Sequence, residues 1–318
     1  LDSAKINNFA KIRLLLDTDG IGIITLLRLV DVFKSINNIF IADKKSLLKL
    51  GNLNNDLTSR LLDSINHFPL FKETIEKEID LLTKYNGNIT TYWDDDYPQQ
   101  LKNIYYPPVI LYTLGNYIES DVQAISIVGT RKSTDYGKHI TKYFATELAK
   151  QNITIVSGMA RGIDSIAHKA TLECGGRTIA VIGSGLDVVY PPENKQLFND
   201  IVNSGVIISE FPLGTKPDAQ NFPKRNRIIA GLSLGTLVVE TKENGGAMQT
   251  AKFALDQNKE VFAIPGNLTS VQSNGTNELI QRNGAKLVRE PEDILIELEL
   301  KLNPEIGVNI AKPTIDLS

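Results

Sequence analysis

The chain has 318 residues, about twice the length of a typical domain, so its length favours one large domain with one or two smaller ones. Hydrophobic residues make up 42% and charged residues 22%, as in folded globular proteins. The single cysteine, Cys174, excludes an internal disulfide framework, and the sequence contains no run of about 18 apolar residues that could span a bilayer. The formal net charge of -3 argues mildly against binding to nucleic acid, although a local cluster of cations is enough to hold phosphate.

The first 84 residues have a helical pattern. Apolar residues recur at three- and four-residue spacing in IRLLLDTDGIGIITLLRLVDVF, with an interruption at Gly20 and Gly22, and a second helix–glycine–helix pattern surrounds Gly51. This predicts a small all-α domain at 1–84 of the sterile-alpha-motif or helix-hairpin-helix type. A glycine turn in such hairpins can direct N–H groups at a phosphate, but a packing or protein-contact role is favoured. The chain shows no charged-then-apolar secretory leader, so we expect a cytoplasmic protein with no membrane contact.

The next segment, 85–123, mixes β-branched and aromatic residues with the paired prolines Pro107 and Pro108. This composition predicts an extended connector that leads into a short strand and belongs to the domain that follows. The acidic run from Asp94 to Asp96 indicates a solvated turn rather than a metal site, because three consecutive side chains do not converge on one ion. No metal ion is expected.

From Ala124 to about Val288, short apolar runs alternate with amphipathic segments. AISIVG, ITIVSG, TIAVIG, GVIISE, TLVVE and EVFAIPG are typical of strands buried on both faces of a parallel sheet, whereas GKHITKYFATELAKQ, IDSIAHKATLECG and AMQTAKFALDQN are helical. This order predicts an α/β fold, an extended Rossmann-like domain at 85–290 with a doubly wound, mainly parallel sheet. Residues 291–318 are expected to form one helix and a tail, with no clear winged helix.

Glycine-rich segments follow four of the predicted strands, at 128–137, 157–164, 182–195 and 264–280. In an open parallel sheet, ligands bind where strands end and helices begin, and glycine allows loop N–H groups to approach an anion. None of these segments has the G-x-G-x-x-G dinucleotide pattern with its later acidic residue, and the chain contains no G-x-x-x-x-G-K-S/T sequence. We therefore expect an anion site without a bound dinucleotide or any other cofactor.

Six basic residues lie in or near these strand ends: Arg131, Arg161, Lys195, Lys224, Arg225 and Arg227. The last three form an acid-free cluster that precedes the helix-like segment IIAGLSLG. Several cations at strand ends predict a concave phosphate site, in which Arg131 and Arg225 are the strongest candidates. In the alternative interpretation, each arginine pairs with an acid such as Glu210 or Asp187.

Catalysis finds little support in the sequence. Cys174 has no nearby histidine to activate its thiol, so we interpret it as a packing residue. His168 lies four residues after Asp164 on one helix face, where a structural Asp–His hydrogen bond is favoured over a proton shuttle. Ser157 and Ser184 adjoin glycines but lack the G-x-S-x-G elbow, so they are interpreted as phosphate-binding or loop-fixing hydroxyls. We expect a protein that is not an enzyme.

The most specific signal is an ordered set of four segments: AISIVGTRKSTDYG, IVSGMARGIDSIAHKATLECGGRTIAVIGSGLDVVYPPENK, ISEFPLGTKPDAQNFPKRNRIIAGLS and VFAIPGNLTSVQSNGTNELIQRNGAKLV. Together they closely resemble the DNA-processing protein A (DprA, or Smf) family over Ala124 to Val288, and the lead-in WDDDYPQQLKNIYYPPVILYTLGN is also similar. The resemblance implies a non-enzymatic protein that binds single-stranded DNA without sequence preference and forms a homodimer through its Rossmann domain. It also implies that the protein protects incoming DNA and assists loading of the RecA recombinase in natural transformation and recombination.

The resemblance assigns roles to particular residues. Arg131, after Gly-Thr, and Lys195, in PPENK, match DNA-binding basic residues of the family, and Arg225 and Arg227 lie in its P-x-R-N-R segment. We add Lys224 and Arg161 to this DNA-binding set, together with backbone amides and hydroxyls expected to line the same pocket, those of Ser157, Gly158, Gly162, Ser184 and Gly266. Aromatic residues are few in these loops apart from Tyr190 and Phe222, so we expect phosphate contacts to contribute more than base stacking. The affinity is expected to fall with salt.

Two other functions stay open. One is a nucleotide-processing phosphoribohydrolase of the lysine-decarboxylase-like Rossmann group, whose P-G-G-x-G-T-x-x-E signature partly matches ENGGAMQTAKFA at 243–254. The double glycine and Thr250 are present, but Phe253 or Ala254 lies near the position of the glutamate that stabilises the cationic sugar. The other is a protein-binding scaffold, in which the basic residues are paired and the affinity for DNA is negligible.

Overall fold

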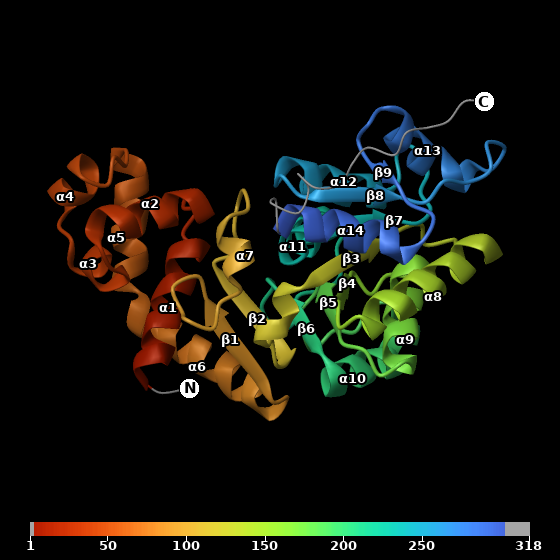
Figure 1. Cartoon of the computed structure of the whole chain (residues 1–318). Coiled ribbons are helices and arrows are strands. Elements are labelled where there is room, and N and C mark those ends of the chain that lie inside the picture. Colours follow the sequence, from red (N-terminus) through yellow and green to blue (C-terminus); the bar gives the residue numbers. More distant parts are fainter. Residues whose placement is uncertain (1–2, 303–318) are drawn as a thin grey trace, which may run out of the picture. The chain divides into compact units, whose positions relative to one another are not determined.

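The computed structural model describes residues 3–302 (Figure 1). The tail expected after the last helix, and the question of a winged helix there, lie outside the described residues. The chain divides into two compact units, Leu1–Leu114 and Gly115–Ser318. The border between these units falls within the segment 85–123, which was expected to belong to the second domain.

Helices make up most of the first unit. Within the described residues they are α1 (Ser3–Asp17), α2 (Ile23–Phe33), α3 (Ile36–Ile41), α4 (Lys44–Lys49), α5 (Asn55–Asn66) and α6 (Phe68–Lys84). The prediction of an all-helical N-terminal part is confirmed. Gly20 lies between α1 and α2 with a φ of +91°, a left-handed conformation that favours glycine. Ser35, Asp43 and Asn54 cap α3, α4 and α5, because each side chain accepts a hydrogen bond from the N–H three residues on.

A hairpin-like pair of strands completes this unit. β1 (Gly87–Thr91) and β2 (Ile110–Gly115) are antiparallel and are separated by the short helix α7 (Gln99–Lys102). The pair is joined to α1 by Tyr112, whose hydroxyl accepts a hydrogen bond of 2.8 Å from Arg13 and whose ring lies edge-on to Phe9. Asp94 accepts a hydrogen bond of 2.8 Å from the N–H of Thr91, so the acidic run forms a turn after β1.

A parallel sheet forms the centre of the second unit. Its strands are β3 (Ala124–Val128), β4 (Thr154–Ser157), β5 (Thr178–Ile182), β6 (Val206–Ser209), β7 (Gly235–Val238), β8 (Glu260–Ala263) and β9 (Lys286–Leu287). Their spatial order is β6-β5-β4-β3-β7-β8-β9, and neighbouring strands are parallel. Every residue of β3 to β7 is buried, which explains their continuous apolar sequences. The predicted doubly wound α/β fold is confirmed.

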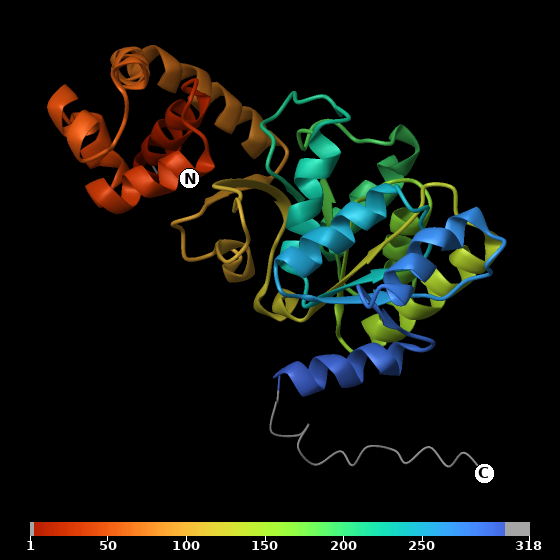
Figure 2. The same ribbon diagram turned by 90° about the horizontal axis from the view of Figure 1, so that it is seen from above.

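Helices cover both faces of this sheet (Figure 1, Figure 2). They are α8 (Asp135–Lys150), α9 (Ile163–Glu173), α10 (Lys195–Ser204), α11 (Asn221–Leu232), α12 (Gly246–Asp256), α13 (Asn274–Gln281) and α14 (Pro291–Leu302). On one face, Phe144 of α8, Ala167 of α9 and Ile294 of α14 share a core with Ile125 and Phe262 of the sheet. On the other face, α11 and α12 pack together. None of the described helices combines the length and apolar character that crossing a membrane requires.

The direction of chain progress reverses between β3 and β7. From β3 the chain proceeds outward through β4, β5 and β6, and it then returns to β7 on the other side of β3. The loops that follow β3 and β7 therefore lead to opposite sides of the sheet, and ligands of open α/β sheets bind at such a switch point. The fold thus directs attention to the loops at 129–134 and 239–245.

Candidate nucleic-acid interface at the switch point

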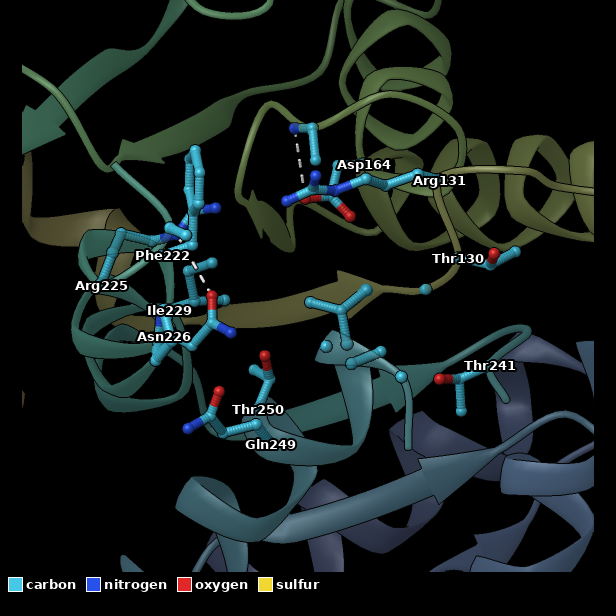
Figure 3. Close-up of a pocket in the computed structure, with 18 of the residues that line it drawn as sticks. Thr130, Arg131, Asp164, Phe222, Arg225, Asn226, Ile229, Thr241, Gln249 and Thr250 are labelled. Carbon is cyan, nitrogen blue, oxygen red and sulfur yellow. Dashed lines mark hydrogen bonds between the residues drawn. The ribbon is translucent and has the colours of Figure 1, made fainter. Parts of the chain in front are cut away.

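A cavity of about 610 Å³ lies at the carboxyl ends of β3 and β7 (Figure 3). Residues that line this switch-point cavity include Thr130, Arg131, Asp164, Phe222, Arg225, Asn226, Thr241, Gln249 and Thr250. A narrow side pocket, lined in addition by Gly158, Arg161, Ser184 and Tyr190, shares Arg131, Phe222 and Arg225 with it. The volume lies within the range of ligand-binding cavities, so the site is large enough for a nucleotide-sized group.

Arg131 provides an exposed cation at this cavity. Its guanidinium carbon lies 5.3 Å from the centre of the Phe222 ring, a cation–π distance, and it forms no ion pair with any described residue. The loop that carries Arg131 is shaped by a hydrogen bond from the N–H of Lys132 to the hydroxyl of Thr130. Phe222 belongs to the first turn of α11 and is half-buried. A guanidinium and an aromatic ring are therefore adjacent, and together they can contact the phosphate and the base of a nucleotide.

Arg225 has a different environment from Arg131. Only 4% of its surface is exposed, and its Nη1 donates to the carbonyls of Gly158, at 2.6 Å, and Val181. Its Nε donates to the side-chain oxygen of Asn226 at 3.2 Å. Burial lowers the pKa of Arg225 to about 10, so the group stays charged at neutral pH. Arg225 therefore ties α11 to the ends of β4 and β5 and contributes a buried positive charge to the cavity.

Asp164 places a negative charge beside these two arginines. It lies in the first turn of α9, is 6% exposed, and accepts hydrogen bonds from the N–H groups of Gly158 and Ala160 at 3.2 and 3.4 Å. Burial raises the pKa of Asp164 to about 6, although the positive charge of Arg225 opposes this shift. Figure 3 shows Asp164 and Arg131 on the same side of the cavity. At neutral pH the ionised carboxylate therefore offsets part of the local positive charge.

The N-terminal part of α12 forms the opposite side of the cavity (Figure 3). Gly245 at its N-cap provides no side-chain cap, and its first turn has no acidic residue, so the positive end of the helix dipole is not neutralised there. Thr250 is 2% exposed and lines the cavity. Gln249 lies next to it. These groups can donate hydrogen bonds to a phosphate or to a base edge.

Two of the predicted arginines are paired with acids. Arg227 is 7% exposed and forms two hydrogen bonds with the carboxylate of Glu210, at 2.8 and 2.5 Å. Arg161 is exposed and forms a similar pair with Glu193, with one contact at 3.1 Å. The alternative interpretation, in which arginines pair with acids, therefore describes these two residues and not Arg131.

The two predicted lysines are exposed and lie outside the linings of these cavities. Lys195 is the first residue of α10 and Lys224 lies within α11. The expectation that the basic cluster precedes a helix is wrong, because α11 begins at Asn221 and contains all three cations. Pro223 is compatible with this start, since proline is tolerated in the first turn of a helix. Within this helix, Lys224 faces solvent whereas Arg225 and Arg227 are buried.

The two predicted serines fix loops through their hydroxyls. Ser157, which is fully buried, donates to the carbonyl of Ile127 at 2.6 Å and so joins β4 to β3. Ser184 donates to the carbonyl of Val188 at 2.8 Å within the loop that lines the side pocket. Both hydroxyls are thus already engaged by the protein, which corresponds to the loop-fixing interpretation.

The predicted glycines have three different settings. Gly158 lines the side pocket, where its carbonyl accepts the hydrogen bond from Arg225. Gly162 has a φ of +75°, and a Cβ at this position would lie 2.3 Å from the carbonyl oxygen of Thr130, so only glycine fits. Gly266 is not among the residues that line the switch-point cavity or its side pocket, where it was expected, and it lines a second cavity at the start of α8 instead.

The expected hydrogen bond between Asp164 and His168 is not formed. His168 is fully buried, and its Nδ1 instead lies 2.7 Å from the hydroxyl of Thr178, which donates in turn to the carbonyl of Ile155. Burial lowers the pKa of His168 to about 3, so this imidazole is neutral at physiological pH. Cys174 is half-buried and its thiol donates to a helix carbonyl.

Sequence reasoning did not place Asp164, Asn226, Gln249 or Thr250 in the binding cavity. Asp164, Gln249 and Thr250 lie in the first two turns of helices that follow buried strands, a position that could have marked them as site residues. Asn226 follows a buried arginine within α11, and the pattern of apolar residues gives no signal for it.

Comparison with known proteins places this geometry in a family. The model of the family described as DNA recombination-mediator protein A matches residues 88–299. Protein Smf from Synechocystis sp. is 38% identical over 286 residues, which cover 88% of this chain and 70% of that protein. DNA processing protein DprA from Bacillus subtilis is 44% identical over 218 residues, which cover 68% of this chain and 71% of that protein.

Solved structures agree with this match. DNA processing protein A from Streptococcus pneumoniae has a TM-score of 0.79 at 33% identity, and the match covers 91% of this chain and 97% of that one. DNA processing protein A from Helicobacter pylori, studied for its single-stranded DNA binding mode, has a TM-score of 0.60 at 30% identity and covers 67% of this chain and 97% of that one. The chain therefore belongs to the DNA recombination-mediator protein A (DprA/Smf) family.

Proposed function

We propose that this protein binds single-stranded DNA without sequence preference in the switch-point cavity, protects the incoming strand and assists loading of RecA in recombination and natural transformation. The observation that carries this proposal is the contact between Arg131, an exposed cation with no ion pair in the described part of the chain, and the Phe222 ring at a ligand-sized cavity. The relative from Helicobacter pylori, whose single-stranded DNA binding mode has been described, supports DNA as the ligand.

The cavity offers separate groups for the two parts of a nucleotide. Phe222 can stack on a base, which contributes about 1–3 kcal/mol and is indifferent to base identity. Arg131 and the N-terminus of α12 can hold phosphates, and each neutralised phosphate steepens the salt dependence of single-strand binding by about 0.7 in the log–log slope. These contacts explain affinity for a strand without selection of a sequence.

We propose binding rather than catalysis. The hydroxyls of Ser157 and Ser184 are engaged with backbone carbonyls, and His168 is buried with a pKa far below neutrality. For the competing phosphoribohydrolase function, Thr250 does line the cavity, but the nearby Ala254 is fully buried and supplies no carboxylate. An assay for release of free base from nucleoside monophosphates tests this alternative directly.

We further propose that the protein acts in the cytoplasm as a homodimer formed through its Rossmann-like domain, and that it presents the bound strand to RecA. Light scattering after size-exclusion chromatography tests the dimer. Co-purification of RecA on immobilised protein, with and without oligo-dT, tests the partner. A monomer at micromolar concentration would contradict the first proposal, and absence of RecA retention under both conditions would contradict the second.

The decisive test of DNA binding is fluorescence anisotropy with a labelled oligo-dT at two salt concentrations. Arg131→Ala is expected to weaken binding by about tenfold and to make the log–log slope shallower by about 0.7. Arg225 is unsuitable for this test, because its buried hydrogen bonds support the fold. Lys142→Ala is the matched control, since Lys142 is an exposed cation on α8 paired with Glu173 at 2.8 Å.

Two results would contradict the proposal. One is absence of wild-type binding at low salt. The other is an equal loss of affinity in the Arg131 and Lys142 variants, which would show that binding depends on overall charge and not on the cavity.

A further inference from the structure

A second cavity, of about 660 Å³, lies at the start of α8 and is lined by Thr134, Tyr136, Glu240, Gly266, Asn267 and Ser273 among others. We call it the α8 cavity. It adjoins the first turn between a strand and a helix of the doubly wound sheet, from β3 to α8. In dinucleotide-binding members of this architecture, the pyrophosphate lies at the corresponding turn, on the helix N-terminus. By position alone, the α8 cavity is therefore the expected place for a phosphate.

In this chain a carboxylate already occupies that place. Glu240 follows β7 and is 1% exposed, and its carboxylate accepts hydrogen bonds from the N–H of Thr134 at 3.0 Å and from the Thr134 hydroxyl at 2.5 Å. A Cβ added to Gly137, in the first turn of α8, would lie 2.1 Å from Glu240 Oε2. The carboxylate therefore lies directly against the first turn of α8.

No basic side chain of the described residues forms an ion pair with Glu240. A buried carboxylate is costly unless hydrogen bonds and nearby positive charge stabilise it. Here the stabilising groups are Thr134 and the N-terminus of α8, which are also the donors that a phosphate at this turn would use. The N-terminus of α12 differs, because it has no side-chain cap and no acidic residue in its first turn.

We infer that Glu240 is an internal anion that fills the phosphate position of the α8 turn and so restricts phosphate binding to the switch-point cavity. This inference rests on the proposed function for the identity of the ligand, and it adds a specificity-determining residue. On this inference, pyrophosphate does not bind at the α8 turn, because a group of the same charge already fills the position.

Glu240 also has a structural role that must be separated from this one. Its backbone carbonyl accepts a hydrogen bond of 2.7 Å from the N–H of Thr130, so the residue holds the loop that carries Arg131. Side-chain replacement leaves this carbonyl in place. Glu240→Gln removes the charge but keeps the volume and an acceptor for Thr134, whereas Glu240→Ala and Glu240→Ser remove both charge and volume.

The test is titration with inorganic pyrophosphate, followed by the ¹⁵N NMR signals of the Gly137 and Gly246 amides, which report on α8 and α12 separately. In Glu240→Ala or Glu240→Ser, the Gly137 signal is expected to shift as pyrophosphate is added. The apparent dissociation constant from this shift is expected to be at least tenfold lower than in wild type. In Glu240→Gln the Gly137 signal is expected to stay unchanged, because the amide still fills the space. A purely structural role of Glu240 predicts no gain of pyrophosphate binding in any variant.

A second measurement covers the case in which the truncated variants do not fold. Glu240→Gln is expected to bind oligo-dT about threefold more tightly than wild type at low salt, because this variant lacks a negative charge that repels the DNA phosphates from the α8 cavity. The gain is expected to disappear at high salt, which screens this repulsion. Unchanged affinity of this variant would overturn the inference, as would an unshifted Gly137 signal in folded Glu240→Ala or Glu240→Ser. Failure of the proposed function is recognised separately, by absence of oligo-dT binding in wild type.

Discussion

Replacement of Asp164 by asparagine tests the electrostatics of the switch-point cavity. Burial raises the pKa of this carboxyl from its ordinary 3.8 to about 6, a shift of about two units, which corresponds to about 3 kcal/mol. The folded state binds the proton of Asp164 more tightly than the unfolded state does, so protonation of this carboxyl stabilises the fold. This stabilisation is complete below about pH 4. It is lost as the pH rises towards 6, so the ionised carboxylate lowers the free energy of unfolding at neutral pH.

Asparagine cannot ionise, and its amide oxygen can accept the same hydrogen bonds from the N–H groups of Gly158 and Ala160. Relative to wild type, Asp164→Asn is therefore expected to gain about 3 kcal/mol in the free energy of unfolding between about pH 4 and about pH 7.5. Urea unfolding of both proteins at several pH values measures this difference, in which groups distant from Asp164 cancel. A difference that does not change with pH, or that falls as the pH rises, would refute the assignment of this buried charge.

Two further replacements test the aromatic contact and the buried imidazole. Phe222→Ala is expected to weaken oligo-dT binding by about 1–3 kcal/mol while Phe222→Trp retains it, as measured by anisotropy; equal binding by both variants would exclude stacking. His168 has the opposite pH dependence to Asp164: burial lowers its pKa from 6.5 to about 3, so its stabilisation is complete above about pH 6.5 and is lost as the pH falls towards 3. Between about pH 6.5 and pH 4, wild type should therefore lose about 3 kcal/mol of unfolding free energy that His168→Gln does not lose, as measured by urea unfolding. Equal changes of the unfolding free energy with pH in the two proteins would contradict this prediction.

The fold was predictable because burial leaves a direct signature in the sequence. β3 to β7 are covered on both faces, so their sequences are apolar without interruption and mark a parallel sheet. The start of α11 was not predictable by the same reasoning. Its first turns contain polar and basic residues, and two of them, Arg225 and Arg227, are buried through hydrogen bonds that hydrophobic periodicity cannot detect.

The position of a site residue was easier to predict than its bonding partner. Arg131 directly follows a buried strand, and the rule that ligands bind at strand ends is enough to place it at the cavity. Arg161 lies in the loop after β4 and lines the side pocket, whereas Arg227 lies within α11 and lines neither cavity. Their acidic partners, Glu193 and Glu210, lie 32 and 17 residues away in the sequence. Which arginine meets an acid depends on how the loops fold back, and a single sequence contains no local signal for that.

The arrangement of charge also resolves the conflict between a net charge of -3 and a nucleic-acid ligand. Asp164 offsets the buried Arg225 and Glu240 fills the α8 turn, so the groups left for phosphate are chiefly Arg131, the exposed Lys242 at the cavity and the N-terminus of α12. So few contacts give a shallow salt dependence, with a log–log slope of about -1 to -2 per cavity, and a modest affinity. Tight binding to a strand then requires two cavities on the same DNA, because the second contact becomes intramolecular once the first has formed. The proposed homodimer would meet this requirement, so disruption of the dimer should weaken binding to long oligonucleotides far more than binding to short ones.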